Sequence, residues 1–129
     1  MVDASAAVYL ASMPSAADAL GGFDCVAPPL MWSEAISTLV EATFRGAIPA
    51  AELDASAERL EALPIALAVV GAGHRRRSVE IARTLGWAKT YDAEYVSLAQ
   101  ALGCPLLTVD RRLMRGAARL IELIGPESL

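Results

Sequence analysis

Short apolar runs that alternate with helical segments are the feature of this chain that most constrains its fold. One run, residues 65–70, contains no polar residue, as is typical of a strand buried on both faces of a parallel sheet. Further strands are expected at residues 1–2, 25–27, 105–109 and 120–124. Helical spacing of apolar residues, with Gly or Pro at the ends, predicts helices at residues 6–13, 30–45, 50–63, 74–85, 92–102 and 111–115. This alternation predicts an α/β sandwich around a mainly parallel sheet.

The size and composition of the chain suit one folded domain, residues 1–129, since 55% of the residues are hydrophobic and 20% are charged. The two longest uncharged stretches, residues 4–17 and 62–73, are shorter than the roughly 18 apolar residues of a membrane span, so we expect no membrane partner. Cys25 and Cys104 form no paired motif, and no secretory signal is evident. A reduced, cytoplasmic chain is expected, with a disulfide as the alternative.

The charge of the chain is unevenly distributed. The net charge is −4, which by itself disfavours a nucleic-acid partner. Residues 1–64 hold nine acids and two bases, a charge of −7, whereas residues 65–129 hold six acids and nine bases, a charge of +3. The basic half of the chain can therefore still face a polyanion.

Four acidic residues stand where predicted elements begin or end. Asp3 and Asp110 follow strands, and Glu34 and Asp92 lie near the starts of helices. An acid near a helix N-terminus is stabilised by the helix dipole, which explains Glu34 and Asp92 without any function but leaves Asp3 and Asp110 unexplained. An α/β fold can bring all four to one edge of its sheet, where such a cluster is typical of a site for a hard divalent cation.

The same residues, in the same order, resemble the PIN-domain ribonucleases, and most closely the VapC toxins of bacterial toxin–antitoxin modules. The resemblance covers essentially the whole chain and is carried by DAS at residues 3–5, the helix containing Glu34, YDAEYVSLA at residues 91–99 and LTVDRRL at residues 107–113. It implies a three-layer α/β/α sandwich with a mostly parallel central sheet of about five strands. It also implies that one or two Mg²⁺ or Mn²⁺ ions are held by the catalytic acids Asp3, Glu34, Asp92 and Asp110.

The resemblance extends to further residues and to partners. Ser5 and Thr108 match hydroxyl residues that support the first and last acids by hydrogen bonds. Arg111 and Arg112 directly follow Asp110, so we expect them at the rim of the site, in contact with RNA phosphates. The implied activity is metal-assisted cleavage of RNA by a toxin that a VapB-type antitoxin neutralises. Residues 30–63 are expected to form the antitoxin groove and to contribute to a homodimer.

Two alternatives within the family stay open, namely a nuclease of RNA processing outside any toxin module and a catalytically silent binding module. A response-regulator receiver is disfavoured, because the run at residues 65–70 ends in Gly71 without a phosphoacceptor aspartate. The chain also departs from the family pattern. Its first strand is short, which leaves open a native start upstream of Met1, and Ser37 stands where many relatives carry Asn.

Three further predictions concern side chains near these motifs. Glu94 lies about 200° around its helix from Asp92, so we expect it not to bind the metal directly. His74 begins a helix beside three arginines, where an exposed, solvated side chain is expected. Tyr95 and Trp32 lie among apolar residues at helical spacing, which indicates packing in the core.

Overall fold

The computed structural model describes all of residues 1–129 and places short parallel strands at the centre of the molecule. The strands are β1 (Cys25–Ala27), β2 (Ile65–Leu67), β3 (Leu106–Leu107) and β4 (Leu123–Ile124). Strand β1 pairs in parallel with β2, and β3 pairs in parallel with β4. The N-terminal segment joins the two pairs, since Val2 bridges to Leu107 and its N–H donates to the Val26 carbonyl at 2.9 Å. The order across the sheet is therefore β2, β1, the N-terminal segment, β3 and β4.

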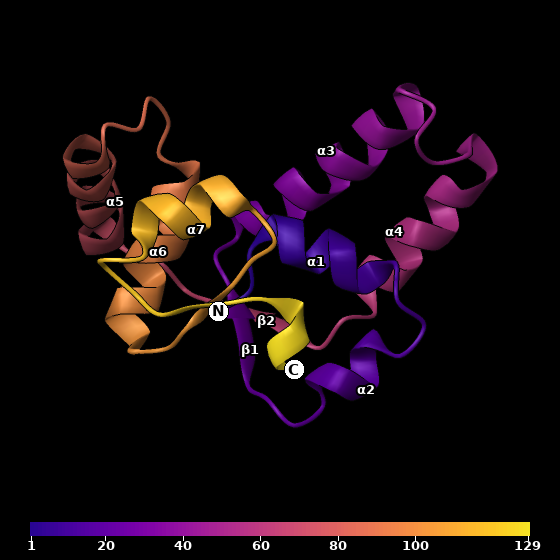
Figure 1. The fold of residues 1–129 in the computed structure, drawn as a ribbon, viewed down its shortest axis with the longest axis horizontal. Coiled ribbons are helices and arrows are strands. Elements are labelled where there is room, and N and C mark those ends of the chain that lie inside the picture. The colour runs from indigo at the N-terminus through magenta and orange to yellow at the C-terminus, as the bar shows by residue number, and fades with distance from the viewer.

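Helices surround these strands on both sides. The α-helices are α1 (Ala4–Ala11), α2 (Ala16–Leu20), α3 (Leu30–Phe44), α4 (Leu53–Glu61), α5 (Ala72–Leu85), α6 (Tyr91–Leu102) and α7 (Arg111–Ala117). Two short 3₁₀ helices, η1 (Ala50–Glu52) and η2 (Pro126–Ser128), complete the chain. Helices α1 to α4 lie on one side of the strands and α5 to α7 on the other (Figure 1). The predicted three-layer α/β/α sandwich with parallel strands is thus confirmed.

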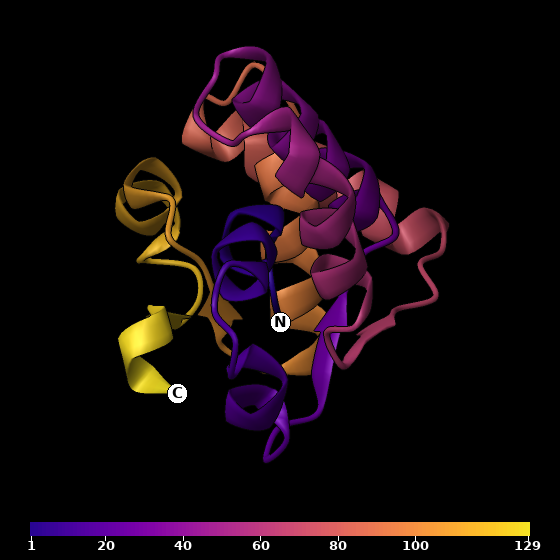
Figure 2. The same ribbon diagram turned by 90° about the vertical axis from the view of Figure 1, so that its right-hand side faces the viewer.

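The two groups of helices are packed differently. Helix α1 contacts both α3 and α4, which run side by side as an arm in the turned view (Figure 2). On the other side, α5 packs on α6, and α6 packs on β3. No helix is both long enough and apolar enough to cross a membrane.

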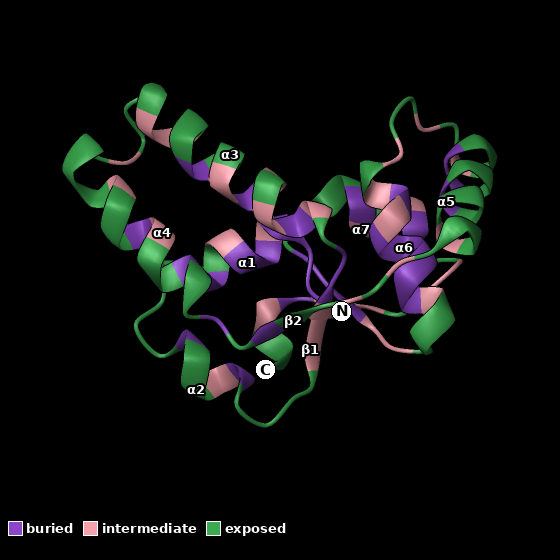
Figure 3. Ribbon diagram, turned by 180° about the vertical axis from the view of Figure 1, so that it is seen from behind, coloured by how far each residue is buried: buried purple, intermediate pink, exposed green.

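The core is built from the strands and from the inner faces of the helices (Figure 3). Val2, Leu106 and Leu113 are at most 1% exposed, and many of the buried helical residues are alanines. Small side chains allow helices to approach the sheet closely, which explains how short elements enclose a core. The burial colours also show that the tips of α3 and α4 are exposed, and Phe44 at the end of α3 is 93% exposed.

The run at residues 65–70 does not form a strand buried on both faces, contrary to the prediction. Only Ile65–Leu67 are in a strand, and Ala66, Leu67 and Val69 are exposed, Val69 completely so. The reason is the strand order, because β2 is at the edge of the sheet and has β1 as its single neighbour.

Element boundaries also differ from those expected. The first helix spans Ala4–Ala11 and is capped by Asp3, whereas a helix at residues 6–13 was expected. The expected helix at residues 50–63 is divided into η1 and α4. The strands near the C-terminus are shorter than the apolar runs that contain them, because a strand ends where its neighbour ends.

Candidate active site

Asp3 and Asp110 lie at the carboxyl ends of neighbouring strands, and each also begins a helix. The Oδ1 atom of Asp3 accepts the Ala6 N–H at 2.7 Å, at the start of α1. The Oδ1 atom of Asp110 accepts the N–H groups of Arg112 at 2.6 Å and Leu113 at 3.1 Å, at the start of α7. Both acids are therefore N-caps, contrary to the expectation that helix ends explain only Glu34 and Asp92. The physical reason is that each strand segment is followed closely by a helix: Asp3 comes directly after the Val2 bridge, and Asp110 comes three residues after the end of β3.

Two hydroxyl groups connect these acids. Ser5 Oγ donates to Asp3 Oδ1 at 2.8 Å and lies 3.3 Å from Thr108 Oγ1. Thr108 Oγ1 in turn accepts the Asp110 N–H at 3.0 Å. Ser5 and Thr108 thus hold the starts of α1 and α7 together, at the sheet edge where α/β proteins bind their ligands.

Asp3 is buried, being only 3% exposed. Burial raises the pKa of the Asp3 carboxyl above its ordinary value. Hydrogen bonds from Thr108, Ala6 and Ser5 oppose this shift, and the nearby charge of Asp110 adds to it. The two strand-end acids therefore repel one another.

Glu34 reaches the site from α3, where it lies in the second turn and not at the start of the helix. Its Oε2 atom accepts a hydrogen bond of 2.7 Å from the Tyr95 hydroxyl on α6. Burial raises the pKa of Glu34, the Tyr95 hydrogen bond opposes the shift, and the charges of Asp92, Asp3 and Glu94 add to it. Glu34 thus faces acids from two other elements.

Asp92 is in the first turn of α6, and its side chain caps no backbone N–H. Its Oδ2 atom accepts a hydrogen bond of 2.5 Å from Arg112 Nη2, which also lies 4.0 Å from Asp110 Oδ2. The guanidinium of Arg112 therefore sits between two of the acids. Arg111 beside it is exposed and forms no ion pair.

Two open pockets border Glu34. A pocket of about 440 Å³ is lined by Glu34, Asp92 and Arg112 together with Trp87, Ala88, Lys89 and Tyr91. A second, of about 460 Å³, runs along α3 from Leu30 to Glu41 and shares Glu34 and Tyr91 with the first. Glu34 and Asp92 are thus reachable from these pockets, whereas Asp3 and Asp110 line neither of them.

The chemistry of the four acids suits a divalent cation, since carboxylate oxygens are the ligands that Mg²⁺ and Mn²⁺ take in proteins. Burial is the main cause that raises the pKa of Asp3 and of Glu34, and the charges of neighbouring acids add to it, so a bound cation would stabilise both carboxylates. No group of three or more histidine, cysteine, aspartate or glutamate side chains converges closely enough here to hold an ion. Arg112 instead supplies the positive charge beside Asp92.

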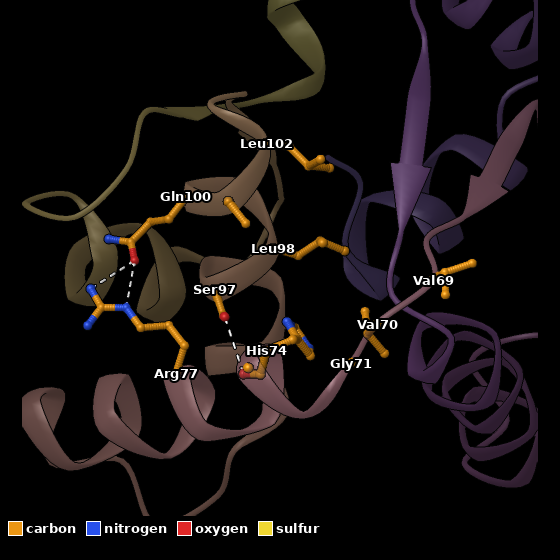
Figure 4. A pocket seen from close by; sticks show the side chains of 11 residues that line it. Val69, Val70, Gly71, His74, Arg77, Ser97, Leu98, Gln100 and Leu102 are labelled. Carbon is orange, nitrogen blue, oxygen red and sulfur yellow. Dashed lines mark hydrogen bonds between the residues drawn. The ribbon is translucent and has the colours of Figure 1, made fainter.

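His74 is not exposed, contrary to the prediction. Its side chain is 8% exposed, and neither ring nitrogen has a hydrogen-bond partner, although Nε2 lies 3.6 Å from Glu94 Oε2. It lines a separate pocket of about 450 Å³ between α5 and α6 (Figure 4). The burial of His74 could have been predicted from helical spacing, because Ser78, Ile81 and Ala82 follow it on the buried face of α5.

Tyr95 is buried in the core as expected, at 2% exposure, but its contact with Glu34 was not anticipated. The signal for it is weak: Tyr95 stands three residues after Asp92, and residues at that spacing share a helix face. Which helix this face meets depends on the tertiary structure.

Comparison with known proteins agrees with this fold. The PIN domain profile matches residues 1–119, so the chain belongs to the PIN-domain family, whose members are generally nucleases. The crystal structure of PAE2754 from Pyrobaculum aerophilum matches with a TM-score of 0.75 at 23% sequence identity, over 98% of this chain and 90% of that chain. This likeness shows the fold. No curated protein matches the chain.

Proposed function

We propose that this PIN domain is a Mg²⁺- or Mn²⁺-dependent endoribonuclease of the VapC type. The observation that carries the proposal is that acids from separate elements, Asp3 and Asp110 after the central strands, Glu34 on α3 and Asp92 on α6, lie near enough to influence one another's ionisation, although no three of them converge to hold an ion in this arrangement. Asp3 and Glu34 keep carboxylates in surroundings that raise their pKa values, which a structural role alone does not require.

The roles of the acids follow from their free oxygens. Asp3 and Asp110 each use Oδ1 for capping, which leaves Oδ2 for a ligand. Asp3 and Asp92 are the first choices as direct ligands, followed by Asp110. Glu34 either binds the ion or orients the attacking water. A divalent ion held there would activate this water and stabilise the charge that grows on the phosphate.

Ser5 holds the carboxylate of Asp3, and Thr108 holds the backbone N–H of Asp110, so both support the acids at the strand ends. The arginines of α7 contact the RNA. Arg111 is free for a phosphate, while Arg112 becomes available when a cation replaces it beside Asp92. The groove along α3 then guides the strand past Glu34.

Replacement of either principal acid tests the proposal. Asp3→Asn and Asp92→Asn are expected to reduce Mg²⁺-dependent cleavage by on the order of 100-fold or more. This equals or exceeds the loss of activity that is usual when a residue that only supports a metal ligand is replaced. The measurement is cleavage of a mixed cellular RNA pool with Mg²⁺ or Mn²⁺, followed by sequencing of the new ends.

Asp54→Asn is the matched control, because it makes the same change at an exposed acid in the first turn of α4. Circular dichroism checks that each variant is folded. Full cleavage by Asp3→Asn and Asp92→Asn would exclude this site.

We further propose that a VapB-type antitoxin neutralises the chain and that the chain forms a homodimer. The α3–α4 arm supports this proposal, because Val40 is 49% exposed and Phe44 is 93% exposed, as expected of a surface that a partner covers. Isolation from the host with a small, tightly bound protein would support the toxin assignment. Isolation without one would favour a nuclease of RNA processing.

A further inference from the structure

Tyr95 is the residue through which α6 holds the carboxylate of Glu34. Its hydroxyl donates to Glu34 Oε2 at 2.7 Å, across 61 positions of sequence. This is the one side-chain hydrogen bond between α3 and the group formed by α5, α6 and α7. Glu34 and Asp92, which line the same pocket, are thereby connected through α6.

The Tyr95 hydroxyl is well suited to hold a carboxylate in place. The residue is 2% exposed and belongs to the hydrophobic core, so its ring is fixed by packing. An ordinary phenol has a pKa of about 10, so the hydroxyl is protonated at neutral pH and acts as the donor to Glu34.

The contact also restricts what Glu34 can do. Because Oε2 is engaged by Tyr95, Oε1 is the oxygen that is free to meet a ligand. Asp92 stands three residues before Tyr95 on the same helix face, so the position of one acid is tied to that of the other.

We propose that Tyr95 is a positioning residue of the nuclease site, which sets the rotamer of Glu34 and presents a single carboxylate oxygen to the metal or the attacking water. This inference rests on the proposed function and deepens it. A residue of this kind acts through its neighbour, and its loss typically weakens metal binding or activity by about 10-fold to 100-fold.

The test is Tyr95→Phe, which removes the hydroxyl and keeps the ring. We expect Mn²⁺ affinity, measured by isothermal titration calorimetry, to fall by about 10-fold, and kcat for RNA cleavage to fall by about 10-fold or more. KM for RNA should stay within about twofold, since Tyr95 is buried and cannot touch the substrate. Tyr9→Phe is the matched control, because that hydroxyl is exposed and forms no hydrogen bond.

A double-mutant cycle separates positioning from general stability. In a Glu34→Gln background, Tyr95→Phe should have no further effect on Mn²⁺ affinity or kcat. Should Tyr95→Phe fail to fold, Glu34→Asp replaces it, because the shorter side chain keeps the charge but withdraws it from the hydroxyl.

Each outcome is decisive. Wild-type affinity and kcat in Tyr95→Phe, or additive losses in the cycle, would overturn the inference while the proposed function stands. A wild-type protein that neither binds Mn²⁺ nor cleaves RNA would overturn the proposed function itself.

Discussion

At the scale of a single residue, the ionisation of Asp3 is subject to two opposing effects. It caps α1 and accepts hydrogen bonds, but it is also buried beside Asp110, and the net effect is a raised pKa. Its ionised form is therefore less favourable in the folded chain than in the unfolded one. A carboxylate kept under such conditions lowers the stability of the protein at neutral pH, as is common for functional groups.

This cost predicts a pH-dependent gain in stability for Asp3→Asn, whose amide still caps α1. Below the unfolded pKa of 3.8, wild-type Asp3 is protonated in both states and its favourable contribution is fully present. As pH rises through the higher folded-state pKa, that contribution is lost in the wild type but not in the variant. In urea unfolding measured from acidic to neutral pH, the free energy of unfolding of Asp3→Asn should therefore increase relative to that of the wild type as the pH rises. A constant difference at every pH would contradict the prediction.

At the scale of elements, two of the acids proposed to bind the metal are also the residues that cap helices α1 and α7. Asp110 follows β3 by three residues and opens α7 by accepting two backbone hydrogen bonds. The same junction at Asp3 opens α1, and the Ser5–Thr108 contact joins the two. Helix starts of this kind are positioned by the sheet, so the acids that cap them are positioned as well.

A pair of substitutions at Asp110 separates capping from chemistry. Asp110→Ala removes the cap of α7 and should cost about 1 kcal/mol of unfolding free energy, whereas Asp110→Asn retains an acceptor and should cost much less. Both should lose RNA cleavage, because neither keeps a carboxylate. Urea denaturation and the cleavage assay measure the two effects. Equal destabilisation by Ala and Asn would argue against the capping role.

At the scale of the whole molecule, the acidic net charge of −4 does not describe the face that would meet RNA. The second half of the chain is basic, and α7 presents the exposed Arg111 next to the acids. Arg112 is partly neutralised by Asp92, so Arg111 is the more available cation.

The salt dependence of RNA binding tests this distribution of charge. In an Asp3→Asn background, which binds without cleaving, Arg111→Glu should weaken binding and reduce the slope of log K against log salt by about 0.7 for each phosphate that the variant no longer neutralises. Arg83→Glu is the matched control, since it makes the same charge change at an exposed arginine in the last turn of α5. An unchanged slope for Arg111→Glu would place the RNA elsewhere.

The fold class and the order of the acids could be predicted from the sequence alone. Local signals were sufficient for this, because helical spacing, apolar runs and Gly or Pro boundaries depend on neighbouring residues. Asp3, Glu34, Asp92 and Asp110 could be selected for the same reason, since each lies near the end of an element and matches a family motif.

The partner of each side chain, in contrast, depends on the tertiary structure. The edge position of residues 65–70 depends on strand order, and the burial of His74 depends on how α5 crosses α6. Tyr95 and Glu34 are 61 positions apart, and Arg112 and Asp92 are 20 apart, so no local pattern connects them. Spacing along the chain predicts which residues share one face of a helix. Which other element packs against that face depends on how distant parts of the chain pack together. This is why the four candidate acids could be selected from the sequence, whereas the contacts of Tyr95 with Glu34 and of Arg112 with Asp92 could not be predicted from it.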